Sequence, residues 1–229
     1  MSINEEPISL TNTRSNRTTK ALKLDKSDFD VPANEETYRA RVKLGKETSS
    51  NREVSLVIKT VNNLSRNEQE EKMDSSDVWI GKYNMIKEAG IPVVPSVRKI
   101  SDRQVAMTDL EADGSVVYGK ADMFNGRATR ALDHLLVQID VNEVNKVAQE
   151  YARLADEAGI LLANDDAFAL VLSPNGEWAI LALDVGLTER REDAQKEVHP
   201  SHLEGWNQVA AQDIFGYISL LQQKMERSS

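Results

Sequence analysis

Two apolar runs of strand length, separated by a turn sequence and bordered by aspartates, constrain the fold of this chain more than any other feature. The first run, 167–172, follows Asp165 and Asp166, and the second run, 178–183, precedes Asp184. The Ser-Pro-Asn-Gly sequence between the runs is typical of a β-turn. We therefore predict a β-hairpin that brings the three acids together at one end.

Carboxylates at the ends of buried strands lose hydration, which costs free energy unless a cation joins them. The grouping of Asp165, Asp166 and Asp184 therefore predicts a divalent-metal site. Each aspartate could equally cap a turn, which is a common role for this residue type. The hairpin alone leaves both interpretations open.

Composition narrows the class of protein. A chain of 229 residues can form one large domain or two lobes, each with its own core. The net charge of -9 argues against non-specific nucleic-acid binding, but it permits a small phosphate ligand held by one or two cations. The chain has no cysteine, no signal-peptide pattern and no apolar run near the ~20 residues of a membrane span. We therefore predict a cytoplasmic protein with no membrane or nucleic-acid partner.

The first half of the chain predicts a mostly β module with one helix. A polar, flexible tail is expected over residues 1–20, and a helix over 76–89, where apolar residues recur at helical spacing. The expected strands cover 21–24, 37–44, 53–61, 97–100 and 104–107. Within 53–61, Lys59 shares a strand face with two valines, so its ammonium must either reach water or meet an anion.

The second half is predicted to be mainly helical. Residues 108–114 read as a linker, and 115–119 as a short strand. The clearest helix is 141–158, with a capping-box start at Asp140 and Glu143 and a glycine stop. Residues 187–200 are predicted to be irregular, and a final helix is predicted to begin at Ser201.

This order of elements resembles the protein-kinase-like fold, in the manner of small atypical bacterial kinases and aminoglycoside phosphotransferases. Five segments carry the resemblance: VSLVIKTV, KEAGIPVVPSV, VAMTDLEADG, LLANDDAFALVL and WAILALDVG. The resemblance implies an α+β, two-lobed fold. Its N-terminal β lobe would cover 21–110, and its helical C-terminal lobe, with the catalytic hairpin, would cover 111–229.

The resemblance also implies a function, namely phosphate transfer from ATP with Mg²⁺ to a hydroxyl of a small molecule or protein. Lys59 would bind phosphate oxygens, and Asp165 would take the proton of the acceptor hydroxyl. Asp184 and Asp166 would hold the metal ion. Met107, at the inner end of the hinge, would lie with Asp109 and Leu110 along the edge of the adenine.

The chain differs from that family in the β module. The family's glycine-rich loop, which covers the phosphates, has no glycine here between residues 25 and 44. The helix glutamate that pairs with the lysine should fall near Trp79, where no acid occurs, and Asp77 is the nearest acid. The partner of Lys59 therefore stays unassigned.

The catalytic loop differs as well. Asn164 follows an alanine where the family usually has histidine, and Leu170 occupies the position of a metal-binding asparagine. Asp166 or Asn164 could supply the missing ligand. Two functions remain open, an active phosphotransferase with a rebuilt loop and a pseudokinase that binds a nucleotide or a protein partner without transferring phosphate.

Overall fold

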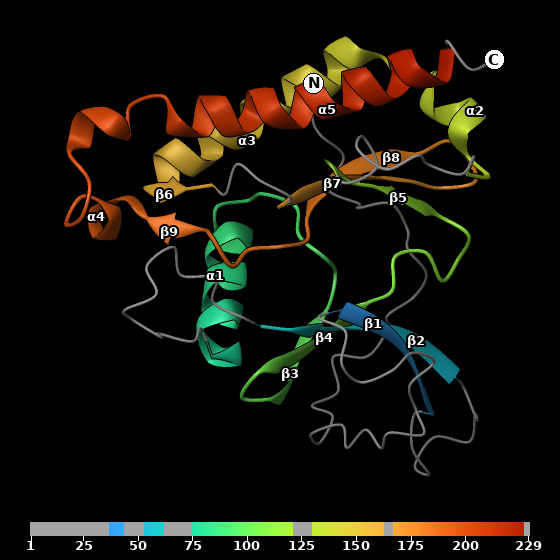
Figure 1. The fold of residues 1–229 in the computed structure, drawn as a ribbon, viewed down its shortest axis with the longest axis horizontal. Helices are drawn as coiled ribbons and strands as arrows, with labels where there is room; N and C mark the ends of the chain where they lie inside the picture. The colour runs from blue at the N-terminus through green and yellow to red at the C-terminus, as the bar shows by residue number, and fades with distance from the viewer. Residues whose placement is uncertain (1–36, 44–52, 62–74, 121–129, 163–166, 227–229) are drawn as a thin grey trace. The chain divides into compact units, whose positions relative to one another are not determined.

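The computed structural model describes residues 37–43, 53–61, 75–120, 130–162 and 167–226 (Figure 1). These residues form α-helices and three separate sheets, which confirms the α+β class. The chain divides into two compact units, one comprising 13–81 and 94–112 and the other comprising 1–12, 82–93 and 113–229. No helix in the described residues combines the length and the apolar character needed to cross a membrane. The expected tail 1–20 and strand 21–24 lie outside the described residues.

The first unit contains a four-stranded antiparallel sheet in the order β1-β2-β4-β3. Its strands are β1 (Thr37–Lys43), β2 (Glu53–Thr60), β3 (Val97–Ser101) and β4 (Gln104–Thr108), close to the predicted bounds. β2 and β4 are rich in β-branched and apolar residues, which favour the pleated conformation. Ile58 and Val105, both fully buried, lie on these central strands.

Helix α1 (Ser76–Glu88) begins in this unit, and the boundary between the units falls within the helix. Ser76 fixes its start, because the backbone N–H donates to Asp102 O (2.8 Å) and the hydroxyl donates to Gln104 O (3.2 Å). Trp79, Tyr83 and Ile86 form the buried stripe that their spacing predicts. The helical prediction over 76–89 is therefore confirmed.

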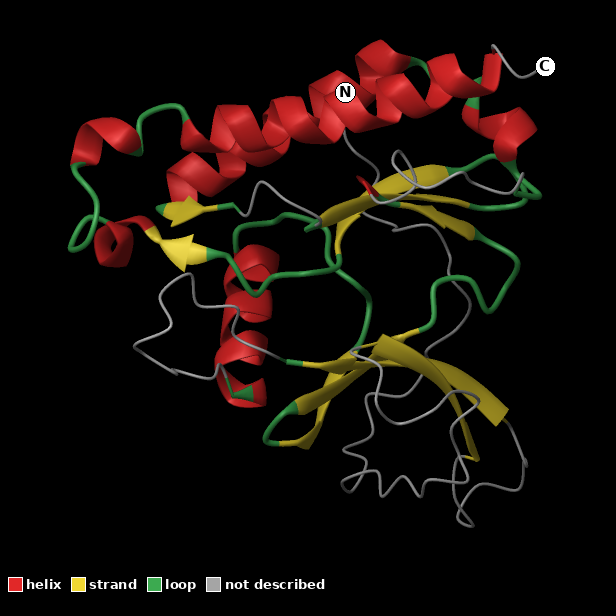
Figure 2. Ribbon diagram, in the orientation of Figure 1, coloured by secondary structure: helices red, strands yellow, loops and turns green. Residues whose placement is uncertain are grey.

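The second unit is built on a three-stranded antiparallel sheet in the order β5-β7-β8. Its strands are β5 (Val116–Tyr118), β7 (Phe168–Leu172) and β8 (Trp178–Ala182). Figure 2 shows helices α3 (Val141–Ala158) and α5 (Trp206–Glu226) side by side over β7 and β8. Each helix donates a tyrosine hydroxyl to a strand carbonyl, from Tyr151 to Ile180 O and from Tyr217 to Phe168 O, both at 2.9 Å.

The ends of α3 follow from its sequence. The Asp140 carboxylate accepts from the backbone N–H of Asn142 at 2.8 Å, and Gly159 ends the helix with φ of 66°. The predicted bounds 141–158 are confirmed, and so is Asp140 as the N-cap. Glu143 differs from the capping-box prediction, because its carboxylate pairs with Lys146 at 2.6 Å.

Residues 187–200 are irregular over much of their length, as predicted, but they also contain two short elements that the sequence did not indicate. They contain β9 (Glu189–Arg190), which pairs with β6 (Ile160–Leu161), and the short helix α4 (Arg191–Ala194). Two-residue strands are too short to show periodicity, which is why their pairing is visible only in three dimensions. The short helix α2 (Asp133–Leu136) precedes α3.

The predicted start of the last helix was wrong. Ser201 lies in a 3-10 turn, Pro200–His202, in which the Ser201 N–H donates to His199 Nδ1 at 3.3 Å. Helix α5 begins only at Trp206, because Gly205 has φ of 69° and its left-handed backbone interrupts the helical path.

Candidate functional site

The hairpin of β7 and β8 has the predicted strands and turn. Phe168 pairs with Ala182 and Leu172 pairs with Trp178, in antiparallel register. At the turn, the Ser173 N–H donates to Glu177 O (2.8 Å), and Gly176 has φ of 87°. The hairpin prediction is therefore confirmed.

At the open end of the hairpin, Ala167 O accepts from the backbone N–H groups of Leu183 (2.7 Å) and Asp184 (3.2 Å). The backbone of Asp184 therefore lies beside the residue that follows Asp166 in the chain. Asp165 and Asp166, with Asn164, lie outside the described residues. The predicted grouping of the three acids consequently stays a prediction at the level of side chains.

A second ladder lies beyond this point. Leu161 pairs with Glu189 in β6 and β9, while Phe168 pairs with Ala182 in β7 and β8. Equal lengths of chain, 162–167 and 183–188, connect the two ladders. The segment that contains Asp165 and Asp166 and the segment that contains Asp184 are thus tied to each other at both of their ends.

Asp184 is half-buried, and its Oδ1 accepts from the Gly186 N–H at 3.1 Å. This contact orients one carboxylate oxygen across the turn Asp184-Val185-Gly186. Carboxylate oxygens are the ligands that Mg²⁺ prefers, so Asp184 has the chemistry of a metal ligand. Among the described residues, no group of three or more acidic, histidine or cysteine side chains forms a metal site.

The predicted phosphate-binding lysine lies in the other unit. Lys59 is half-buried in β2, where it pairs with Thr37 of β1 and Val105 of β4. Asp77, the acid nearest to the expected helix position, pairs with Lys99 of β3 at 2.6 Å. The hydrogen bonds that Lys99 donates to the carboxylates of Asp77 and Asp102 raise its pKa, with Asp77 making the larger contribution.

The predicted adenine-contacting residues are all buried. Met107 pairs with Val57 in the sheet, and Leu110 follows the strand. Both carboxylate oxygens of Asp109 bind within the protein, Oδ2 to the Ser55 hydroxyl (2.6 Å) and Oδ1 to the Glu111 N–H (3.1 Å). The Asp109 side chain therefore stabilises the chain where it leaves β4.

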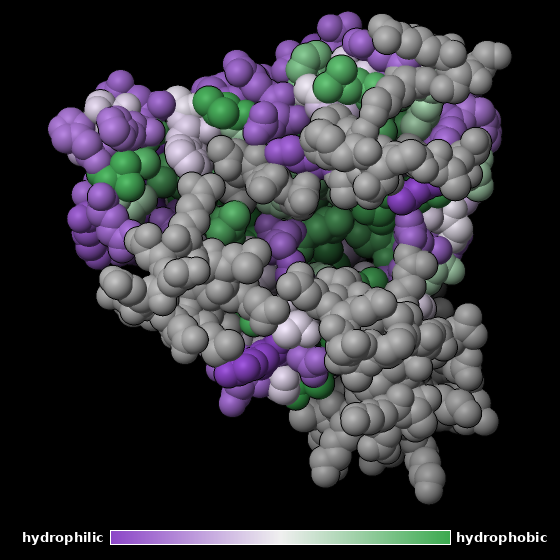
Figure 3. Space-filling view, viewed as in Figure 1, coloured by the Kyte–Doolittle hydropathy of each residue, from purple (hydrophilic) through white to green (hydrophobic). Residues whose placement is uncertain are grey.

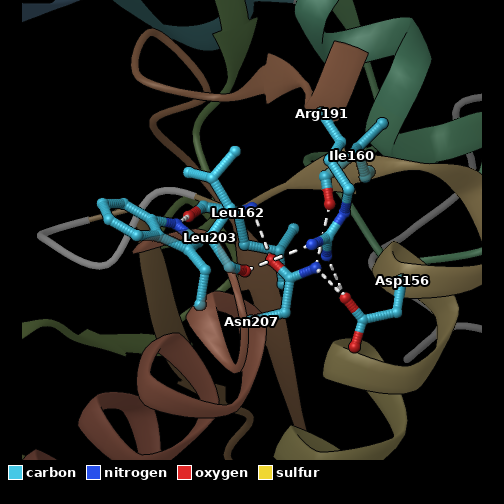
Figure 4. Close-up of polar contacts among 7 residues, drawn as sticks. Asp156, Ile160, Leu162, Arg191, Leu203 and Asn207 are labelled. Carbon is cyan, nitrogen blue, oxygen red and sulfur yellow. Dashed lines mark hydrogen bonds and ion pairs between the residues drawn. The ribbon is translucent and has the colours of Figure 1, made fainter. Parts of the chain in front are cut away.

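Sequence reasoning missed the polar cluster that holds the chain before residue 163. In Figure 4, Asn207 of α5 lies between Leu162, Ile160 and Asp156. Its Oδ1 accepts from the Leu162 N–H (2.8 Å), and its Nδ2 donates to Ile160 O (2.9 Å) and Asp156 Oδ1 (2.8 Å). The neighbouring Trp206 indole N–H donates to Leu162 O (2.8 Å). Two consecutive side chains of α5 thus hold both backbone polar groups of Leu162.

Arg191 completes this cluster from α4. Its Nη2 contacts Asp156 Oδ1 (2.5 Å), and its Nη1 donates to Leu203 O (3.1 Å). The cluster joins α3, α5 and the start of α4 around the two-residue strand β6. A buried asparagine inside an apolar helical stripe was the only signal for it in the sequence.

A second missed residue is Lys82 of α1. Its Nζ donates to Gly186 O at 2.5 Å, at the end of the Asp184 turn. The signal in the sequence was its spacing, because Lys82 follows Trp79 by one helical turn and precedes Ile86 by another.

The surface near α4 and β9 does not resemble a ligand site. Figure 3 shows mostly hydrophilic side chains there, around a small hydrophobic area. Arg190 and Glu192 are exposed, and they line an open cavity together with Ala158 and Gly159 at the end of α3. None of the site residues predicted from the sequence lines this cavity.

Comparison with protein-family models gives no match for this chain, and comparison with curated proteins gives no significant match.

Proposed function

We propose that this protein is a cytoplasmic phosphotransferase of the two-lobed kinase-like fold, which uses ATP and Mg²⁺ to phosphorylate a hydroxyl of a small molecule or protein. The observation that carries the proposal is the pairing at the open end of the hairpin. Ala167 O accepts from both Leu183 N (2.7 Å) and Asp184 N (3.2 Å), directly after the acids that precede β7. Such an arrangement supports a shared oxygen-ligand site for a hard divalent cation.

Each residue has a defined role in this proposal. Asp184 and Asp166 hold Mg²⁺, which when bound neutralises charge on the β- and γ-phosphates. Lys59 binds a phosphate oxygen. Asp165 accepts the proton of the acceptor hydroxyl as its oxygen bonds to the γ-phosphorus, while the bond from that phosphorus to the bridging oxygen of ADP breaks.

Adenine recognition is assigned to the chain around Met107, Asp109 and Leu110. Because the Asp109 carboxylate already binds Ser55 and Glu111, the contribution of this residue to adenine binding falls to its backbone. Backbone donors and acceptors suit the edge of a planar base, since they need no further side-chain ordering.

One observation favours the alternative, a pseudokinase that binds a nucleotide or protein partner without catalysis. Asp77 binds Lys99, and the buried Trp79 occupies the helix position where the family places its lysine-binding acid. An enzyme of this class needs that lysine–acid pair in place for activity. The chain therefore either uses another group to orient Lys59 or has lost phosphate transfer.

A thermal-shift titration with ATP and Mg²⁺ tests both nucleotide-binding functions. At a hundred times the dissociation constant, a ligand adds about 2.7 kcal/mol of stability, which for a chain of this size is about 5–10 °C. Lys59→Met and Asp184→Asn should reduce the shift, each compared with the same variant without ligand. Asp184→Asn keeps an oxygen that can accept from Gly186 N–H, so it removes the charge and preserves the turn. An absent shift in the wild-type protein contradicts nucleotide binding. A shift in both variants as large as that of the wild type contradicts binding at Lys59 and Asp184.

Radiolabel transfer from ATP then separates the enzyme from the pseudokinase. If Asp165 is the base, Asp165→Asn abolishes transfer and retains the ATP-induced thermal shift. Asp166→Asn should instead weaken the Mg²⁺-dependent shift. Binding without transfer in the wild-type protein, across small-molecule and protein hydroxyl acceptors, identifies the pseudokinase.

A further inference from the structure

Helix α1 and the chain directly after it hold the end of the hairpin on both sides of Asp184. On one side, the backbone N–H of Ala182 donates to Pro92 O at 3.0 Å. On the other side, Lys82 Nζ donates to Gly186 O at 2.5 Å. All of these residues belong to the same unit. The turn that contains Asp184 is therefore fixed before and after the aspartate by one stretch of chain.

Gly186 is the residue of this turn that most needs a contact of this kind. Glycine populates more backbone conformations than other residues, so fixing it costs the most conformational entropy. Val185 before it is fully buried, whereas Leu187 after it is 60% exposed. Packing therefore holds the turn as far as Val185, and the bond from Lys82 extends that hold to Gly186.

The two polar backbone groups of Gly186 link Lys82 to the proposed metal ligand. The carbonyl accepts from Lys82, and the N–H donates to Asp184 Oδ1 at 3.1 Å. A lysine that fixes this carbonyl thus restrains the residue whose N–H orients the carboxylate. Lys82 lies on α1 one helical turn after Trp79 and one before Ile86, both of which are buried. Such a packed helix is a rigid support for a site.

We propose that Lys82 is a positioning residue, which orients the metal ligand Asp184 by holding Gly186. This inference rests on the proposed function, because it needs Asp184 to bind the metal ion. Partners in the outer shell of a metal site fix the orientation of its ligands, and their loss lowers metal affinity. Lys82 makes a further interaction besides its bond to Gly186. The positioning role requires neither an unpaired charge nor a contact between the ammonium and the nucleotide.

The competing interpretation is that Lys82 stabilises the fold around α1 without orienting Asp184. The two roles differ in how far the effect of Lys82→Met extends. A positioning residue acts locally, so its loss releases Gly186 and weakens metal binding while the rest of the hairpin stays protected. A residue that only stabilises the fold acts on the whole hairpin, so its loss lowers protection throughout.

Amide hydrogen exchange of the metal-free protein measures the local effect. Lys82→Met should make the Gly186 N–H exchange about tenfold faster or more, because its bond to Asp184 is no longer restrained. The Leu183 N–H, which donates to Ala167 O at 2.7 Å, is the internal control and should exchange at the wild-type rate. Lys82→Arg still carries donors and should keep the Gly186 N–H protected.

Titration of the full chain with Mn²⁺ measures the effect on the proposed metal site. Lys82→Met should weaken Mn²⁺ binding by about ten- to a hundredfold, the usual cost of losing an outer-shell partner. Lys82→Arg should restore most of the affinity, because it restores the donor. Lys87→Met, at an exposed position on the same helix, is the matched control and should bind Mn²⁺ like wild type. Asp184→Asn should lose binding, because it removes the charge of a ligand.

Ligand-free melting curves check that each variant is folded. If Lys82→Met does not fold, Lys82→Gln takes its place, because its shorter side chain also withdraws the donor from Gly186 O. The same exchange rates and Mn²⁺ affinities are then expected of Lys82→Gln.

The inference is overturned if Gly186 exchanges at the wild-type rate in Lys82→Met. It is also overturned if Leu183 loses as much protection as Gly186, because Lys82 then acts on the whole hairpin. A third contrary result is wild-type Mn²⁺ affinity in Lys82→Met together with its loss in Asp184→Asn, and in that case the proposed function stands without Lys82. If the wild-type protein binds no Mn²⁺, the proposed function fails, and the positioning role fails with it.

Discussion

Replacing Asn207 by alanine tests the structural basis of the candidate site most sharply. The side chain is fully buried, and it makes hydrogen bonds to Leu162 N, Ile160 O and Asp156 Oδ1 at 2.8–2.9 Å. Alanine removes all three bonds. It leaves the Leu162 N–H and the Ile160 carbonyl without this partner in a site that is closed to water.

The expected cost follows from those two backbone groups. A buried polar group without a partner costs about 1–3 kcal/mol, so Asn207→Ala should destabilise the protein by about 2–6 kcal/mol. For a chain of this length, each kcal/mol lowers the melting temperature by about 2–4 °C. Asp156 loses less, because its carboxylate keeps the contact with Arg191.

The variant Asn207→Asp should destabilise the same cluster to an extent that depends on pH. The new carboxylate can accept from Leu162 N–H but cannot donate to Ile160 O, and it repels Asp156. Its folded-state pKa should be raised, so the destabilisation should be greatest at neutral pH and should diminish as pH falls and the group is protonated. Urea unfolding at several pH values measures this trend.

Asn142→Ala is the matched control, because Asn142 is exposed at the start of α3, where its side chain bonds only locally, to Asp140. Its effect should stay within about 0.5 kcal/mol. If Asn207→Ala costs no more than Asn142→Ala, the buried cluster does not hold the chain before residue 163, and the reasoning is refuted.

Two further substitutions test the packing of α3. Burial raises the pKa of the Tyr151 phenol above its ordinary value, so the unfolded state loses its proton first and stability falls as pH rises above about 10. Tyr151→Phe removes the hydrogen bond to Ile180 O, so it should lower the free energy of unfolding by about 1 kcal/mol at neutral pH. Because phenylalanine cannot ionise, the urea midpoint of this variant should fall less at alkaline pH than that of the wild type. An equal fall in both proteins contradicts the assignment to Tyr151. Gly159→Ala should lower the free energy of unfolding by about 1–2 kcal/mol in thermal unfolding, because alanine is strained at a φ of 66°. No atom lies within 4 Å of the added Cβ, so this cost comes from the backbone conformation and not from a clash. Gly81→Ala, inside α1 with equal space, should stabilise the protein, and a loss of stability there would count against this backbone explanation.

Much of the fold was predictable because local signals agreed with the tertiary structure. The β7–β8 hairpin has two strand-length apolar runs around a turn sequence, and Gly176 takes the positive φ that the turn requires. Helix α3 combines an amphipathic stripe with Asp140 before it and Gly159 after it. In each case a single stretch of chain contains the whole signal.

The features that escaped prediction depend on contacts between distant segments. The pairing of β6 with β9 involves two residues on each side, too few for any periodicity. Asn207 and Lys82 both lie on buried helix faces, where a polar residue can be paired by a backbone group far away in sequence. Their partners, Leu162 and Gly186, could not be named without the tertiary structure.

The candidate site itself was predictable only in part. The position of Asp184 beside Ala167 follows from the hairpin register, which the sequence indicates. The roles of Asp165, Asp166 and Lys59 came from resemblance, and they stay proposals, because charge and residue type alone do not establish what a site binds.

The central claim is that Asp184 holds a metal-bound nucleotide, and the Mg²⁺ dependence of the ATP-induced thermal shift tests it most directly. The account predicts a shift of about 5–10 °C in wild type at saturating ATP and Mg²⁺, lost when the metal is chelated and largely lost in Asp184→Asn. An ATP-induced shift that is the same with and without Mg²⁺, and the same in Asp184→Asn, would contradict it.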